Sequence, residues 1–190
     1  MIEVSSTHQI ILEREVLGGD NMIIGDPQIF AVWIDQVDAW STAKFSNGCL
    51  AYIVEEHMYP QQPFLSTIGS DIASMANFTC LEKAVGDGNL AAKGPQEVFE
   101  SLCVLAFPGM NSNAESSDYT HLVSPLSILD AGYAFFLLQE EGGDRLVFGD
   151  VAKPSNAWEV RLPKDMFITV IQQAIGQWKA ILNREKTPFS

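Results

Sequence analysis

Basic residues are scarce in this sequence. It contains 11 Lys and Arg against 24 Asp and Glu, for a formal net charge of −13, and its basic residues are not clustered. Proteins that bind nucleic acids use clustered Lys and Arg to contact phosphates, so the composition argues against a nucleic-acid partner. Residues 1–100 hold 14 acids and 4 bases (net −10), whereas residues 101–190 hold 10 acids and 7 bases (net −3). This imbalance indicates either an acidic surface that steers a basic partner or a charge that only maintains solubility.

Long apolar runs are also missing. The longest runs, such as Tyr133–Leu138, fall far short of the ~20 residues that a membrane-spanning helix needs. The first 20 residues carry charges that a signal peptide would not tolerate in its apolar core: Glu3, Glu13, Arg14 and Glu15. We therefore expect a cytoplasmic protein with no membrane contact. A chain of 190 residues is long enough to bury a core without disulfides or metals, and we predict a single domain over residues 1–190.

Residues that bind metals or act as nucleophiles are few. No C-x-x-C pair and no zinc-ligand spacing occurs among Cys49, Cys80, Cys103, His8, His57 and His121. We interpret the cysteines as reduced, mostly buried thiols. His57 follows Glu55 and Glu56, which could form a metal or acid–base site, but we favour an exposed histidine beside two solvated carboxylates.

Sequence motifs of catalysis are absent as well. The sequence has no P-loop, no G-x-G-x-x-G and no G-x-S-x-G element. Two carboxylate pairs, Asp35 with Asp38 and Glu140 with Glu141, could in principle serve acid–base chemistry. Most carboxylates in so acidic a chain are simply solvated, and we predict a protein that is not an enzyme and that has no cofactor and no metal.

Short β-strands are predicted in the first third of the chain. Residues 9–16 and 22–24 favour strands because β-branched and apolar residues flank a turn at 17–20. Residues 28–40 fit either a strand or a helix, and we prefer a strand because residues 31–34 are apolar on both faces. The Ser46–Asn47–Gly48 sequence predicts a hairpin turn into a strand over 49–54.

Helices and a second hairpin are predicted in the rest of the chain. Apolar spacing predicts helices over 70–85, capped by Ser70 and closed by Gly86, and over 95–106. Residues 108–120 have no periodicity and are predicted to form an exposed loop. Strands are expected at 133–139, 145–148 and 158–162, before a long amphipathic helix over 167–182. The fold class is therefore α+β, with a mainly antiparallel sheet and about three helices packed against it.

A sequence resemblance appears between Met22 and Trp40. This segment contains, in order, Ile24–Gly25–Asp26–Pro27, Phe30–Ala31 and Val37–Asp38–Ala39–Trp40. The order resembles that of the immunity protein 42 family of bacterial polymorphic toxin systems of the contact-dependent inhibition type. Similar features recur at Asn47–Gly48, at Asp144–Gly149 and in the C-terminal helix, so the likeness covers about residues 22–60 and 130–183. Residues 1–21 precede the point where family members commonly begin, which fits an N-terminal extension with an added strand, a variant feature of the family or an upstream start.

The resemblance implies an intracellular immunity protein that binds and neutralises a cognate toxin domain. Acidic inhibitors suit basic nucleases, whose phosphate-binding grooves carboxylates can occupy. The density of acids then predicts a partner-binding face formed by Asp20, Asp26, Asp35, Asp38, Glu55 and Glu56. The alternative for each is plain surface charge, and the Gly25–Asp26–Pro27 turn fits a fold signature equally well.

Two other functions compete with this one. A non-enzymatic cytosolic adaptor or regulatory subunit would have the same composition and a different partner. A small hydrolase would require a deep pocket in which a histidine, a cysteine and an acid converge within hydrogen-bonding distance.

Overall fold

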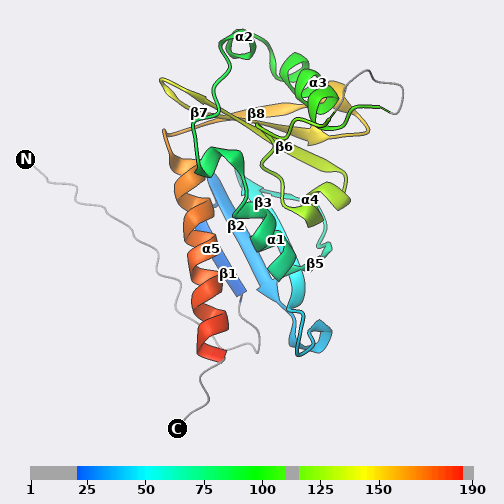
Figure 1. Cartoon of the computed structure of the whole chain (residues 1–190), viewed down its shortest axis with the longest axis vertical. Helices are drawn as coiled ribbons and strands as arrows, with labels where there is room; N and C mark the ends of the chain where they lie inside the picture. Colours follow the sequence, from blue (N-terminus) through cyan, green and yellow to red (C-terminus); the bar gives the residue numbers. More distant parts are fainter. Residues whose placement is uncertain (1–20, 110–115, 186–190) are drawn as a thin grey trace, which may run out of the picture.

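The structure is a computed structural model that describes residues 21–109 and 116–185. These residues form two antiparallel β-sheets and five α-helices (Figure 1). The five-stranded sheet contains β1 (Asn21–Asp26), β2 (Phe30–Gln36), β3 (Asn47–Val54), β4 (His57–Tyr59) and β5 (Leu65–Thr67). The three-stranded sheet contains β6 (Tyr133–Glu140), β7 (Gly143–Asp150) and β8 (Trp158–Leu162). The helices are α1 (Ile68–Met75), α2 (Gly88–Ala91), α3 (Pro95–Ala106), α4 (Leu126–Asp130) and α5 (Met166–Glu185).

The predicted α+β class with antiparallel sheets is confirmed. The helices expected near 95–106 and 167–182 are α3 and α5, and the hairpin expected near 133–148 is the β6–β7 pair. Two short helices, α2 and α4, were not predicted because four or five residues carry too little periodicity. The strand predicted at 9–16 lies outside the described residues, as does the middle of the loop predicted at 108–120.

The five-stranded sheet runs in the order β1–β2–β3–β4, and β5 pairs with the other end of β3. The strand preferred over a helix for residues 28–40 is confirmed for Phe30–Gln36, and a single 3-10 turn follows at Asp38–Trp40. The connection from β2 to β3 occupies residues 37–46, so the turn predicted at Ser46–Asn47–Gly48 is wrong. Gly48 lies inside β3. The residue is a glycine because a Cβ atom there would come 2.0 Å from the carbonyl oxygen of Asp35.

The helix predicted over 70–85 is also wrong in its extent. Helix α1 begins at Ile68, after Thr67 rather than Ser70, and it ends at Met75. The side chain of Asn77 donates to the carbonyl oxygen of Ala73 at 2.7 Å, which satisfies a free carbonyl of the last turn. The apolar residues beyond this point still reach the core, but they do so from a 3-10 turn and irregular backbone.

Side chains of alternating direction in β6 and β7 divide the core in two. One face of the three-stranded sheet, including Phe135 and Phe148, packs with α1, α5 and the inner face of the five-stranded sheet. The other face, including Phe136 and Val147, packs against α2 and α3. Figure 1 shows this arrangement, with α1 and α5 on one side of the five-stranded sheet and α3 beyond the three-stranded sheet. The described helices include none that is long and apolar enough to cross a bilayer.

Candidate functional site

Three of the predicted partner-binding acids lie together at one end of the five-stranded sheet. The β1–β2 turn and the β3–β4 turn meet there, because the N–H of Glu55 donates to the carbonyl of Ile29 at 3.2 Å and that of Glu56 to the carbonyl of Pro27 at 2.8 Å. Asp26, Glu55 and Glu56 are all exposed. We call these three residues the acidic tip.

The backbone of the acidic tip is unusual. Glu55 and Glu56 form the two-residue turn between β3 and β4, with φ angles of +47° and +68°. Two-residue hairpins with both angles positive favour Asn-Gly, because other side chains lose roughly 1 kcal/mol each in the left-handed region. The chain places two carboxylates where small turn residues would be more stable. The turn therefore carries a backbone cost of this order at two exposed carboxylates.

The other predicted acids are not part of this group. Asp35 pairs in register with Asn21 and Cys49 at the opposite end of the sheet, about 17 Å along β2 from its first residue. Asp38 follows in the 3-10 turn, where its carboxylate accepts a hydrogen bond from the side chain of Gln36 at 3.3 Å. Asp20 lies outside the described residues. The structure thus divides the predicted face into two acidic ends.

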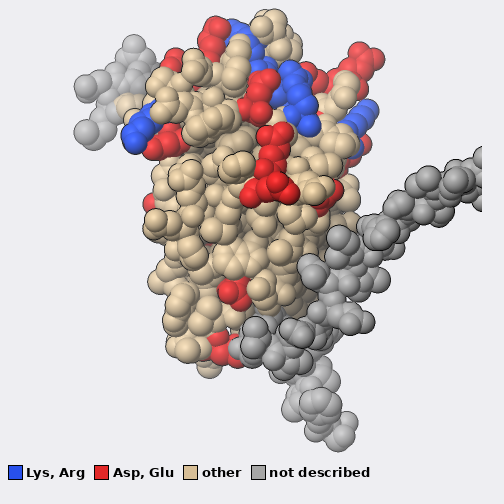
Figure 2. All heavy atoms as spheres, turned by 180° about the vertical axis from the view of Figure 1, so that it is seen from behind, with Lys and Arg blue, Asp and Glu red and all other residues tan. Residues whose placement is uncertain are grey.

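An apolar surface separates these two ends. The described helices cover only the inner face of the five-stranded sheet. We call the opposite face the outer face. Three rows of cross-strand neighbours form it: Asn21, Asp35, Cys49 and Leu65; Ile23, Trp33 and Ala51; Gly25, Ala31, Ile53 and Met58. Among these described positions, Asp35 alone is charged. Figure 2, seen from behind, shows few carboxylates and no Lys or Arg among the coloured residues in the lower part of this side.

Sequence analysis missed the outer face, although a signal was present. Antiparallel strands that face water on one side normally alternate apolar and polar residues. In β2, residues 31–34 are apolar on both faces, a pattern that we used only to choose between strand and helix. In an antiparallel sheet the same pattern predicts that the second face is apolar as well.

The Gly25–Asp26–Pro27 sequence has a clear structural role. Gly25 has a φ angle of +105°, and a Cβ atom there would lie 2.5 Å from the carbonyl oxygen of Phe30 and 3.1 Å from a methyl group of Val170 in α5. The carboxylate of Asp26 accepts the N–H of Gln28 at 2.9 Å, which closes the turn. The motif therefore fixes both the β1–β2 turn and the position of α5 against it.

The Asp144–Gly149 segment is structural as well. The carboxylate of Asp144 accepts the N–H of Phe167 in the first turn of α5 at 3.4 Å, and burial raises the pKa of this carboxyl. Arg145, which is 1% exposed, donates to the carbonyl oxygens of Leu90 at 3.1 Å and Lys93 at 2.7 Å and pairs with the carboxylate of Glu159. These bonds attach α2 and the segment after it to the three-stranded sheet.

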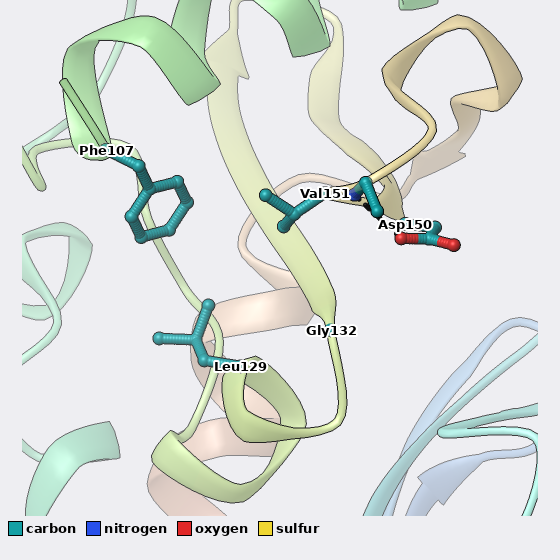
Figure 3. A pocket seen from close by; sticks show the side chains of 6 residues that line it. Phe107, Leu129, Gly132, Asp150 and Val151 are labelled. Atoms are coloured by element: carbon teal, nitrogen blue, oxygen red, sulfur yellow. Dashed lines mark hydrogen bonds between the residues drawn. The ribbon is translucent and has the colours of Figure 1, made fainter. Parts of the chain in front are cut away.

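A pocket with a mostly apolar lining lies apart from these surfaces. This open pocket of about 400 Å³ is lined by Phe107, Leu129, Gly132, Asp150, Val151 and Ala152. Figure 3 shows Phe107, Leu129 and Val151 facing the same space, whereas the carboxylate of Asp150 points away from it. In the described ranges, no three His, Cys, Asp or Glu side chains converge as a metal site would require.

The histidines and cysteines near these surfaces have ordinary partners. His57 and His121 each use Nδ1 to donate to a backbone carbonyl, those of Glu55 at 2.7 Å and Leu137 at 2.9 Å. All three cysteines are free, as predicted. Burial raises the pKa of Cys80 to about 12 and that of Cys103 to about 11, so both are protonated thiols at neutral pH.

Comparison with known proteins identifies the class to which this fold and surface belong. The sequence matches the model of the immunity protein 42 family over residues 22–177, and the chain belongs to that family. A solved structure, that of CdiI from Burkholderia dolosa AUO158, is similar, with 36% sequence identity and a TM-score of 0.76 over 82% of this chain and 99% of that chain. Among curated proteins, none matches this sequence. The resemblance inferred from residues 22–60 and 130–183 is confirmed, and the family match includes the segment between them.

Proposed function

We propose that this protein is an intracellular immunity protein that binds and neutralises the toxin domain encoded beside its gene. The observation that carries the proposal is the family match over residues 22–177, supported by the likeness to CdiI over nearly the whole length of that chain. An inhibitor of this kind acts by occupying its partner and needs no catalytic group of its own. Toxin–inhibitor pairs are among the tightest protein complexes known.

The acidic tip is the part of the proposed interface that would guide the partner. Residues 21–67 contain five acids (Asp26, Asp35, Asp38, Glu55 and Glu56) and one base (Lys44), a net charge of −4 for this part of the chain. A field of one sign raises the rate at which an oppositely charged protein associates. A nuclease domain, whose substrate groove must be basic to bind phosphates, is the toxin class that this surface fits best.

The backbone of the acidic tip is also preorganised. Hydrogen bonds between the β1–β2 and β3–β4 turns fix the backbone of Glu55 and Glu56. The bond from the N–H of Gln28 to the carboxylate of Asp26 closes the β1–β2 turn. Groups held in place before binding lose less conformational entropy in the complex. The turns that carry these carboxylates would therefore lose little backbone entropy when a partner binds.

The test is co-expression of this protein with the toxin domain encoded next to it, with growth and co-purification as readouts. Rescue of growth together with a stable complex is the expected result, and failure of both refutes the function. The variant Asp26→Asn/Glu55→Gln/Glu56→Gln should associate about tenfold more slowly at low salt, with a weaker dependence on salt. The control Glu82→Gln/Glu100→Gln/Asp130→Asn removes the same charge from exposed acids on other elements, and equal slowing by both would show that net charge alone matters.

A further inference from the structure

The outer face of the five-stranded sheet is apolar and no described helix covers it; its large side chains are exposed or partly exposed, whereas the small residues Ala31, Cys49 and Ala51 are buried. We infer that it is the surface on which the toxin domain docks, with its apolar rows at the centre of the interface and the carboxylates at its edges. This inference rests on the proposed function and adds which surface contributes most of the binding free energy.

The exposure of the outer face differs from that of an ordinary solvated sheet. Ile23 and Leu65 are 47% and 65% exposed, and Trp33, Ile53 and Met58 are partly exposed beside them. Surfaces of this kind, apolar at the centre and rimmed by polar groups, mark protein interaction sites. The side chains stand on hydrogen-bonded strands rather than loops, so docking would require little reordering.

Exposed aromatic residues extend this surface at the end near Asp35. Trp40 and Phe45, in the connection from β2 to β3, and Phe64, just before β5, are 51%, 57% and 38% exposed. Asn47 holds these segments beside each other, since its side chain donates to the carbonyl of Trp40 at 2.7 Å and accepts the hydroxyl of Thr67 at 3.1 Å. Aromatic residues, Trp above all, carry much of the energy of protein interfaces.

The carboxylates at the two ends of the sheet favour a basic partner over a second copy of this chain. The acidic tip lies at one end of the five-stranded sheet, and Asp35 and Asp38 lie at the other. A second copy of this chain would bring the same carboxylates together, and like charges across an interface oppose association. A partner with an apolar patch between basic residues would meet no such repulsion, and a basic toxin domain has this chemistry.

The two kinds of residue should then affect different rates. Exposed carboxylates at an edge act mainly on association, whereas apolar side chains buried on docking act mainly on dissociation. Ile23→Ser/Leu65→Ser should raise the dissociation rate of the complex with the adjacent toxin domain at least about tenfold and change its association rate less than about twofold. Helix α3, at the opposite end of the molecule, supplies a matched control in Leu105→Ser/Val104→Ser, at residues 48% and 67% exposed.

The experiment measures both rates by surface plasmon resonance, with circular dichroism and urea unfolding to establish that each variant is folded. Faster dissociation of the sheet variant alone supports the inference. Weaker binding of the α3 variant alone, or of neither, overturns it and leaves the proposed function standing. A wild-type protein that forms no complex overturns both.

Two further measurements address other occupants of the same face. Sedimentation of the free protein should show a monomer, and a dimer that Ile23→Ser/Leu65→Ser dissociates would assign the face to a second copy. Oxidative footprinting should modify Trp33 and Met58 in the free protein and protect them in the complex. Protection already present in the free monomer would assign the face to another part of this chain and overturn the inference.

Discussion

Removal of the buried guanidinium of Arg145 should be among the most destabilising single changes in this protein. Arg145→Met keeps most of the side-chain volume but leaves the carbonyls of Leu90 and Lys93 and the partly buried carboxylate of Glu159 without their donors. An orphaned buried acceptor costs about 1–3 kcal/mol, and a buried ion pair that loses one partner costs about 3–5 kcal/mol in total. We expect a loss near 4 kcal/mol, about a third of the stability of a typical domain.

Urea unfolding followed by circular dichroism measures this loss. With a slope of about 2 kcal/mol per molar urea, the midpoint should fall by about 2 M. Arg161 provides the control, because it lies directly opposite Arg145 in the register of β7 and β8 and pairs with Glu140, yet its side chain is 54% exposed. Arg161→Met should cost less than about 1 kcal/mol. Equal losses from the two variants would refute the argument that burial of the ion pair decides its importance.

Three other predictions concern single features of the structure. Gly25→Ala should cost about 2 kcal/mol or more in unfolding free energy, because its φ of +105° and the nearby β2 backbone exclude a Cβ atom, whereas Gly69→Ala, in open space on α1, should cost nothing. Glu55→Asn/Glu56→Gly should stabilise the protein by about 1–2 kcal/mol and slow toxin association, and a loss of stability would contradict the strain assigned to that turn. Cys103, with its pKa raised by burial to about 11, should resist alkylation in the native protein at pH 8, where about a thousandth of it is thiolate, and should react readily once unfolded.

Much of the fold could be predicted because its signals are local. The continuous apolar run of β6, the Gly-containing turn before β7 and the long apolar stripe of α5 are each visible without reference to the rest of the chain. The helix expected over 70–85 shows the limit of this approach. Its apolar spacing is real, but Phe78, Cys80 and Val85 reach the core from irregular backbone, which spacing alone does not distinguish from a helix.

The candidate site was harder to predict because it depends on contacts between distant segments. Asp26 and Glu55 come together only because the β1–β2 and β3–β4 turns fall at the same end of the sheet. Asp35 is an aspartate like Asp26 and is close to it in sequence, yet it lies at the opposite end of the sheet. Gly48 illustrates the same limit. The Asn47–Gly48 pair predicted a turn, but the glycine is needed because the backbone of Asp35 in the neighbouring strand leaves no room for a Cβ atom.

The two-residue period of β1, β2 and β3 has an evolutionary consequence. Inward residues such as Ile24, Val32 and Tyr52 are nearly fully buried against the helices, whereas Ile23 and Leu65 on the outer face touch little of the core. Mutations can therefore change the outer face one residue at a time while every inward neighbour keeps its packing. With a toxin domain docked there as proposed, a lineage whose toxin changes its surface can follow that change from this scaffold without first losing a stable fold.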